Sequence, residues 1–344
     1  MAKQKIVYVV GAGLSAGLDF PVIGDLLPKI WGRLEAAGTS IPLAKVIRFH
    51  HPDFNPAAPE TYPTIEQLLS EMAANAELFD SSRPATGTFT STELLNTQRD
   101  LLLELAGWFH ELQRKALRKT PEWFSSLAES MKTQGAQIIS FNWDLLLDKV
   151  LFGSDLAKSS YGLDPSYEGV KLLKPHGSLN WYERRTGRYL SEDKKFSLYG
   201  EGASEVFSFK PFRAVISTRR QYMPLIIPPM YAKRFDNELF VHIWREAVSA
   251  LSTATDVRFL GYSLPDADFH ARFILRCGFH NQESGLLTED GKRAEPTGRA
   301  KVTIVDPAGR KGGPGRIERA TGWQCKVYKQ TVEEWILSGG LTKA

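Results

Sequence analysis

The turn Gly11-Ala12-Gly13 is the first place where residue types and spacing suggest chemistry. It ends an apolar, β-branched run over residues 6–10 and precedes a segment with a helical pattern. Where a strand, a glycine turn and a helix start meet, backbone N–H groups converge on an anion, and Ser15 adds a hydroxyl donor. Glycines also let the backbone approach a pyrophosphate without a Cβ in the way. The turn therefore indicates a nucleotide site, with a purely structural glycine turn as the alternative.

Polar residues also follow the other apolar runs of the chain. The runs at 136–141, 257–260 and 302–305 each stop at a polar or glycine-containing segment, and a histidine lies in a further short segment. If these runs are parallel strands, their carboxyl ends meet at one edge of the sheet, where such sheets bind ligands. The residues concerned are Asn142 and Asp144, His176 between Pro175 and Gly177, Gly261 and Ser263, and Asp306.

Each of these polar side chains also has a structural interpretation. Asn142 suits the N-cap of the helix after it, and Asp144 suits the positive end of that helix's dipole. His176, before a glycine, fits a turn in which the backbone satisfies its imidazole. Asp306, before a proline, fits the start of a turn. Each residue alone leaves both interpretations open, whereas polar residues at four such places in one chain favour a site.

Strand patterns that alternate with helical patterns predict a doubly wound, parallel α/β sheet of the Rossmann-like kind, covered on both faces. The segment GRKGGPGR lacks the Gly-Lys-Ser/Thr ending of a phosphate-binding P-loop and is predicted to be a basic, flexible surface loop. The helical patterns lie at 26–34, 64–79, 94–117, 121–132, 144–151, 232–252 and 267–277, and the basic loop lies at 309–316.

The same patterns divide the chain into a core and two inserts. The core, with all four predicted strands, comprises 1–36, 136–181 and 223–344. Residues 37–135 are predicted to form a large helical insert. Residues 182–222 have short alternating runs with Tyr, Phe and Gly and are predicted to form a smaller insert of hairpins or irregular structure.

The composition of the chain argues against several classes of protein. The chain has 344 residues, 24% charged and 42% hydrophobic, as in ordinary globular proteins. A net charge of +4 is too small to indicate nucleic-acid binding. Cys277 and Cys325 are the only cysteines, too few for a disulfide framework or a zinc ribbon. With no signal-peptide pattern and no apolar run near about 18 residues, we expect a cytoplasmic protein without a membrane segment.

Four motifs in order resemble those of a known superfamily. GAGLS with its following FP, then SFNWD, KPHGSLNW and GYSLPDAD, are similar to motifs of the sirtuin-like (silent information regulator) NAD-binding proteins. More narrowly, they resemble the bacterial branch found in antiphage defence. The matching motifs run from residue 5 to about 307 and leave the two inserts outside. The resemblance implies a doubly wound core that takes NAD as its substrate and cleaves the nicotinamide–ribose bond.

The resemblance also implies a role for each matching residue. It makes Asn142 and His176 the catalytic residues and places Asp144, with Asn142, beside the nicotinamide ribose. The implied NAD-binding residues are Gly11, Ala12, Gly13 and Ser15 at the phosphates, Gly261 and Ser263 in the second glycine–serine loop, and Asp306 at the adenine-side ribose.

Two departures from the family pattern matter. Sirtuin deacylases usually carry four zinc-binding cysteines, which this chain cannot supply, so we expect no zinc. Without that module, water is favoured over an acyl-lysine peptide as the acceptor. Asp19 stands where many sirtuins have a glycine before the Phe-Pro step, so the nicotinamide-side loop is expected to differ.

The resulting hypothesis is hydrolysis of NAD⁺ to ADP-ribose and nicotinamide by an antiphage defence effector. An NAD-dependent protein deacylase and a non-catalytic subunit that binds NAD or ADP-ribose are the alternatives. Because an enzyme that consumes NAD throughout the cell must be restrained, we expect a homo-oligomer or a partner protein to control its activity. The family's habits suggest a DNA-translocating ATPase or an Argonaute-type protein as that partner.

Overall fold

The computed structural model describes residues 4–78, 89–157, 159–164, 166–185, 194–196, 222–226, 238–266, 268–288 and 290–343. The chain divides into two compact units. Unit 1 comprises Met1–Phe20, Lys115–Gly177 and Arg234–Ala344, and unit 2 comprises Pro21–Arg114 and Ser178–Lys233. These units divide the chain at other positions than the predicted core and inserts, whose boundaries stay a prediction.

Unit 1 is built on a six-stranded sheet in the order β3-β2-β1-β7-β8-β9, and every neighbouring pair is parallel. The order reverses at β1, as in doubly wound nucleotide-binding folds. The predicted fold class is therefore confirmed. The strands are β1 (Ile6–Val10), β2 (Gln137–Ser140), β3 (Lys171–Leu173), β7 (Asp256–Leu260), β8 (Lys301–Val305) and β9 (Lys326–Tyr328).

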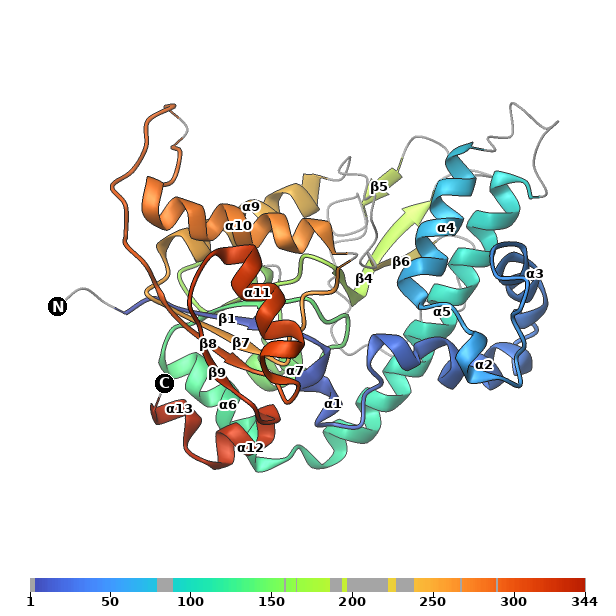
Figure 1. Ribbon diagram of the computed structural model, residues 1–344, viewed down its shortest axis with the longest axis horizontal. Coiled ribbons are helices and arrows are strands. Elements are labelled where there is room, and N and C mark those ends of the chain that lie inside the picture. The colour runs from blue at the N-terminus through green and yellow to red at the C-terminus, as the bar shows by residue number, and fades with distance from the viewer. Residues whose placement is uncertain are drawn as a thin grey trace. The chain divides into compact units, whose positions relative to one another are not determined.

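Helices cover both faces of this sheet. Figure 1 shows α9 and α10 on one side of the strands and α6 and α12 on the other. Double coverage explains why all five residues of β1 and of β7 are buried, without the alternation of a half-exposed strand. The helices of unit 1 are α1 (Ala12–Ala16), α6 (Glu122–Thr133), α7 (Leu146–Phe152), α9 (Glu238–Thr253), α10 (Phe269–Ser284), α11 (Gly313–Thr321), α12 (Val332–Leu337) and α13 (Gly340–Lys343).

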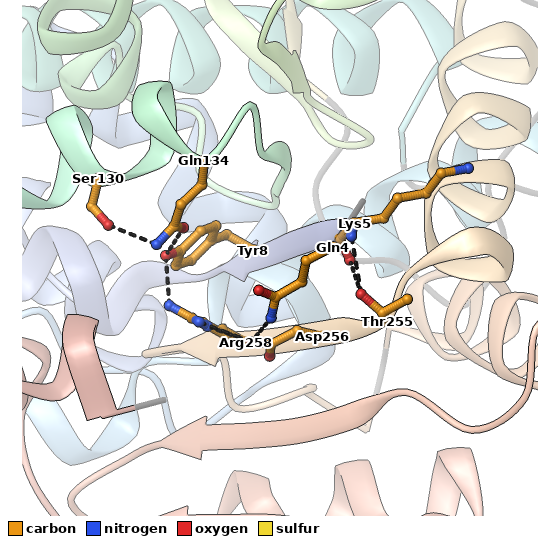
Figure 2. A network of polar contacts seen from close by, with 8 residues as sticks. All are labelled: Gln4, Lys5, Tyr8, Ser130, Gln134, Thr255, Asp256 and Arg258. Atoms are coloured by element: carbon orange, nitrogen blue, oxygen red, sulfur yellow. Dashed lines mark hydrogen bonds and ion pairs between the residues drawn. The ribbon is translucent and has the colours of Figure 1, made fainter. Parts of the chain in front are cut away.

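A buried polar network joins β1 to β7 inside this unit (Figure 2). The guanidinium of Arg258 forms an ion pair with Asp256 at 2.8 Å, with side chains only 3% and 1% exposed. The same guanidinium donates to the hydroxyl of Tyr8 at 3.0 Å, and that hydroxyl donates to Gln134 at 2.8 Å. Burial raises the pKa of Tyr8, so its hydroxyl keeps its proton as a donor.

The predicted loop at 309–316 is wrong. A 3₁₀ turn at Gly309–Lys311 leads into α11, whose residues Gly313, Pro314 and Gly315 are buried. Glycine and proline argue against a helix interior, but at a helix start proline lacks only an N–H that would be unpaired anyway. Tertiary packing therefore decided this segment.

Sequence patterns also missed two short strands and one helix. The strands β3 and β9 have three residues each, too few to show a period. The helix α3 (Ser40–His50) also lies in a region for which no separate helix was predicted. The strands predicted at 6–10, 136–141, 257–260 and 302–305 are confirmed within one or two residues.

Unit 2 contains helices and a small sheet. The strand β4 pairs antiparallel with β5, which agrees with a predicted hairpin, and the sheet order is β5-β4-β6. Residues 186–193 and 197–221 of the predicted 182–222 insert lie outside the described residues. The elements of unit 2 are α2 (Leu26–Ala36), α3, α4 (Ile65–Leu78), most of α5 (Ser91–Ala116), β4 (Gly177–Arg185, from Ser178), β5 (Lys194–Phe196) and β6 (Tyr222–Ile226), with 3₁₀ turns at Ile23–Asp25 and Pro59–Thr61. Across the described residues, no helix combines the length and apolar character needed to cross a membrane.

Candidate functional site

Two loops meet backbone to backbone at the carboxyl edge of the sheet. The amide of Gly13, after β1, donates to the carbonyl of Gly261, after β7, at 2.8 Å. A Cβ added to Gly11 would lie 2.6 Å from the Cα of Tyr262, and one added to Gly13 would lie 2.8 Å from the Cα of Gly261. The glycines are therefore required by this loop contact. Their predicted role, with Ala12, at the phosphates of NAD stays a prediction.

Asn142 is fixed against the first of these loops. Its side-chain nitrogen donates to the carbonyl of Gly11 at 3.0 Å and to the hydroxyl of Ser15 at 2.9 Å. Because a carbonyl only accepts, this contact sets the orientation of the amide. The interpretation of Asn142 as a helix N-cap is wrong, since α7 begins at Leu146 and Leu145 precedes it. The amide oxygen of Asn142 accepts no hydrogen bond among the described residues.

Ser15 links Asn142 to a buried carboxyl. Its hydroxyl donates to Oδ2 of Asp144 at 2.7 Å while it accepts from Asn142. The single hydroxyl hydrogen is thus committed inside the protein. Asp144 also accepts from the amide of Leu146 at 3.0 Å, which confirms its expected contact with the start of α7. Burial raises the pKa of Asp144, and the nearby charge of Lys174 opposes that rise.

Lys174 anchors the segment that carries the histidine. Its ammonium group is fully buried and donates to the carbonyl of Asp144 at 2.6 Å and to the carboxylate of Asp148 at 3.2 Å. Tyr161 donates to the same carboxylate. A buried ammonium is retained in a fold only where such partners satisfy it. Lys174 therefore fixes the turn that follows it to the start of α7.

His176 lies in that turn, closed by a hydrogen bond from the amide of Gly177 to the carbonyl of Lys174 at 3.0 Å. The expected turn is confirmed, but the imidazole of His176 contacts side chains of other segments. Nε2 of His176 lies 3.0 Å from Oδ2 of Asp268, and the imidazole is 5% exposed. The ring also meets the edge of Phe141, the neighbour of Asn142, at 4.9 Å between centroids.

The loop after β7 has a strained backbone, and a side chain of α11 holds it in place. Leu264 has a φ of +47°, a conformation rare for a bulky side chain. Arg316 donates to the carbonyls of Ser263 and Leu264, each at 2.9 Å. A Cβ on Gly313 would lie 2.5 Å from the Cα of Ser263, so α11 begins directly against this loop. The predicted binding roles of Gly261 and Ser263 stay predictions.

Asp306 ends β8 and begins a turn, as its structural interpretation predicts. Its Oδ1 accepts from the amide of Ala308 at 2.8 Å, and its carbonyl accepts from the amide of Gly309 at 3.1 Å. Its side chain is mostly buried, and Oδ2 would lie 3.0 Å from a Cβ on Gly313. A contact of Asp306 with an adenine-side ribose stays a prediction.

Asp19 occupies a backbone conformation that glycine favours. Its φ is +63°, in the left-handed region. This conformation explains physically why a glycine suits a position before a Phe-Pro step, and aspartate adopts it only at a cost.

Sequence reasoning missed the residues that surround His176. Asp268 is the last residue of the GYSLPDAD motif, and its spacing carried no signal that it would face a histidine. Phe141 and Tyr262 stack at 4.4 Å with an interplanar angle of 12°. Only the fold brings these aromatic rings together. Within the described ranges, no group of three or more His, Cys, Asp or Glu side chains could hold a metal ion.

Of the comparisons with known proteins, only the comparison with solved structures finds a similarity. No protein-family model and no curated protein matches the chain. Among solved structures, 99% of the chain is similar to 91% of a Sir2 homologue in complex with NAD, at 11% identity and a TM-score of 0.47. It is also similar to Sir2Tm bound to a propionylated peptide, at 14% identity, a TM-score of 0.40 and coverage of 99% and 95%. At these values, nothing about the activity of this chain follows from the similarity.

Proposed function

We propose that this chain hydrolyses NAD⁺ to ADP-ribose and nicotinamide. The observation that carries the proposal is the meeting of four motifs at one sheet edge. Asn142 bonds to the loop after β1, while its neighbour Phe141 contacts both His176 and the loop after β7. An edge where the strand order reverses is the place at which parallel sheets bind dinucleotides. The four ordered motifs that resemble sirtuin-like proteins support NAD as the ligand.

The proposed chemistry suits the groups present. Departure of neutral nicotinamide leaves an oxocarbenium-like ribose, so the protein must position water and stabilise positive charge. The fixed amide of Asn142 presents an oxygen acceptor that can orient water or a ribose hydroxyl. The imidazole of His176 is the base that takes the proton released when water adds to the ribose.

Water is the acceptor that the sequence favours. The two cysteines cannot supply the four-cysteine zinc module of sirtuin deacylases. The groove that this module helps to frame for an acyl-lysine peptide is then incomplete. We extend the proposal to a role as an antiphage effector, restrained by oligomerisation or by a partner such as a translocating ATPase or an Argonaute-type protein. The resemblance of the motifs to the defence branch supports this extension.

The test is nicotinamide release from NAD⁺ by the purified chain, with and without an acetyl-lysine peptide. We expect release without peptide, and a loss of about 10²-fold or more in Asn142→Ala and His176→Ala. His280→Ala is the matched control, because this exposed histidine lies on α10 away from the turn that carries His176. Release that requires the peptide indicates a deacylase. Saturable NAD or ADP-ribose binding without release indicates a binding subunit or a missing activator.

A further inference from the structure

The carboxylate of Asp268 is a fixed acceptor beside His176. It is fully buried at the start of α10, with Oδ2 3.0 Å from Nε2 of His176. The hydroxyl of Tyr262 lies 3.3 Å from the same oxygen, and the amide of Ala271 donates to Oδ1 at 3.2 Å. These three contacts come from three segments of unit 1. All of them are donors toward an acceptor-only carboxylate.

An ionised carboxylate at this distance determines which imidazole nitrogen carries hydrogen. Nε2 must donate, so the lone pair of the neutral ring lies on Nδ1. We propose that Asp268 is a positioning residue that holds His176 in its Nε2–H tautomer and makes Nδ1 the proton acceptor. The proposal rests on the hydrolysis of NAD⁺ proposed above.

Aromatic packing keeps the imidazole from exchanging its two nitrogens by rotation. Phe141 meets the ring of His176 edge-on, with an interplanar angle of 65°, and itself stacks on Tyr262. Both aromatic side chains are at least nine-tenths buried. Packing therefore fixes the orientation of the ring, and Asp268 fixes its hydrogen.

The proton balance of the step gives Asp268 its effect. The bond between C1′ of the ribose and the nicotinamide nitrogen breaks, and its electron pair leaves with neutral nicotinamide. The oxygen of water bonds to C1′, and its released proton moves to Nδ1 of His176. The resulting imidazolium keeps Nε2–H on Asp268, whose negative charge stabilises it. The proton then passes to solvent, so the net products are ADP-ribose, nicotinamide and H⁺.

Asp268→Asn separates this role from that of capping α10. The asparagine oxygen can keep the bond from the amide of Ala271, which places the NH₂ group where Oδ2 faces His176. That NH₂ donates, so Nε2 must become the acceptor and the ring must change to its Nδ1–H tautomer. Asp266→Asn is the matched control, because this carboxylate is 78% exposed on the same loop.

The experiment uses the full chain labelled with ¹⁵N-histidine, and His176→Gln identifies the signals of His176. At alkaline pH, the ¹⁵N shifts report which nitrogen carries hydrogen. We expect Nε2–H in the wild type and in Asp266→Asn, and Nδ1–H in Asp268→Asn. We also expect kcat for nicotinamide release to fall about 10²-fold in Asp268→Asn, with KM changed less.

If Asp268→Asn does not fold, Asp268→Ser serves as the second variant. Serine caps helices about as well as aspartate but is too short to reach His176 in place of the carboxylate. We expect a mixture of tautomers in this variant. An Nδ1–H wild type, or an unchanged His176 spectrum in the folded variants, overturns the proposal. If the wild type releases no nicotinamide, the proposed hydrolysis fails while the tautomer measurement still decides the role of Asp268.

Discussion

The amide of Gly13 donates to the carbonyl of Gly261 at 2.8 Å, which joins the first and second glycine loops directly. A Cβ on Gly261 would lie 2.5 Å from the carbonyl carbon of Gly13, and its φ is +61°. This contact closes the two loops at the point where the strand order reverses. The close approach of the two loops explains why glycine is needed at these positions even without a bound ligand.

Gly261→Ala should therefore destabilise the protein more than its backbone conformation alone requires. Gly322→Ala is the matched control, because its φ is +74° and nothing lies within 4 Å of an added Cβ. We expect the control to lose about 1–2 kcal/mol of unfolding free energy and Gly261→Ala to lose more. Urea unfolding of both variants measures the difference. Equal losses would contradict the prediction, because the contact between the two loops would then add nothing to the effect of the backbone conformation.

Asp19→Gly should stabilise the chain. Asp19 has a φ of +63° and an exposed side chain, so glycine relieves the conformation without removing a buried contact. The gain is at most about 1 kcal/mol, because glycine also adds entropy to the unfolded chain. Asp19→Ala should be less stable than the wild type. Denaturant midpoints for the three proteins check the order, and a less stable Asp19→Gly would contradict it.

Arg258→Met should cost about 3–5 kcal/mol of unfolding free energy, because it leaves the carboxylate of Asp256 buried without its cation. The network is drawn in Figure 2. Arg272→Met is the control, since its ion pair with Asp266 has side chains 35% and 78% exposed and should cost below about 1 kcal/mol. Asp256→Asn combined with Arg258→Met should recover part of the loss. Thermal and urea unfolding measure these effects, and similar losses from Arg258 and Arg272 would refute the prediction.

Asp144 should make stability fall as pH rises. Burial raises its pKa in the folded state, so between the ordinary aspartate value of about 3.9 and the folded value the native state binds more protons. In that range the unfolding free energy decreases with pH. Asp144→Asn removes this dependence, so its stability relative to the wild type should improve as pH increases. Urea unfolding at several pH values tests this, and a constant difference would count against it.

The sequence by itself determined the parallel α/β core and the residues at its strand ends. Long apolar runs such as 6–10 and 257–260 have no alternation, because strands covered on both faces need apolar residues throughout. A parallel sheet then brings the residues after each strand to one edge. The position of Asn142 at that edge follows from connectivity alone, whereas His176 follows β3, a strand of three residues that the sequence pattern did not predict.

Only the tertiary structure decided what these residues contact. The segment 309–316 has the glycines and proline of a loop, yet packing against Ser263 and Asp306 makes its second half the start of α11. Asp268 lies 92 positions after His176 in the chain, so no local pattern links them. Burial removes water as a competing partner and makes such distant polar pairs bond to each other. That is why the hydrogen bonds of the site depend on the folded chain, whereas its strands and loops could be predicted from residue types.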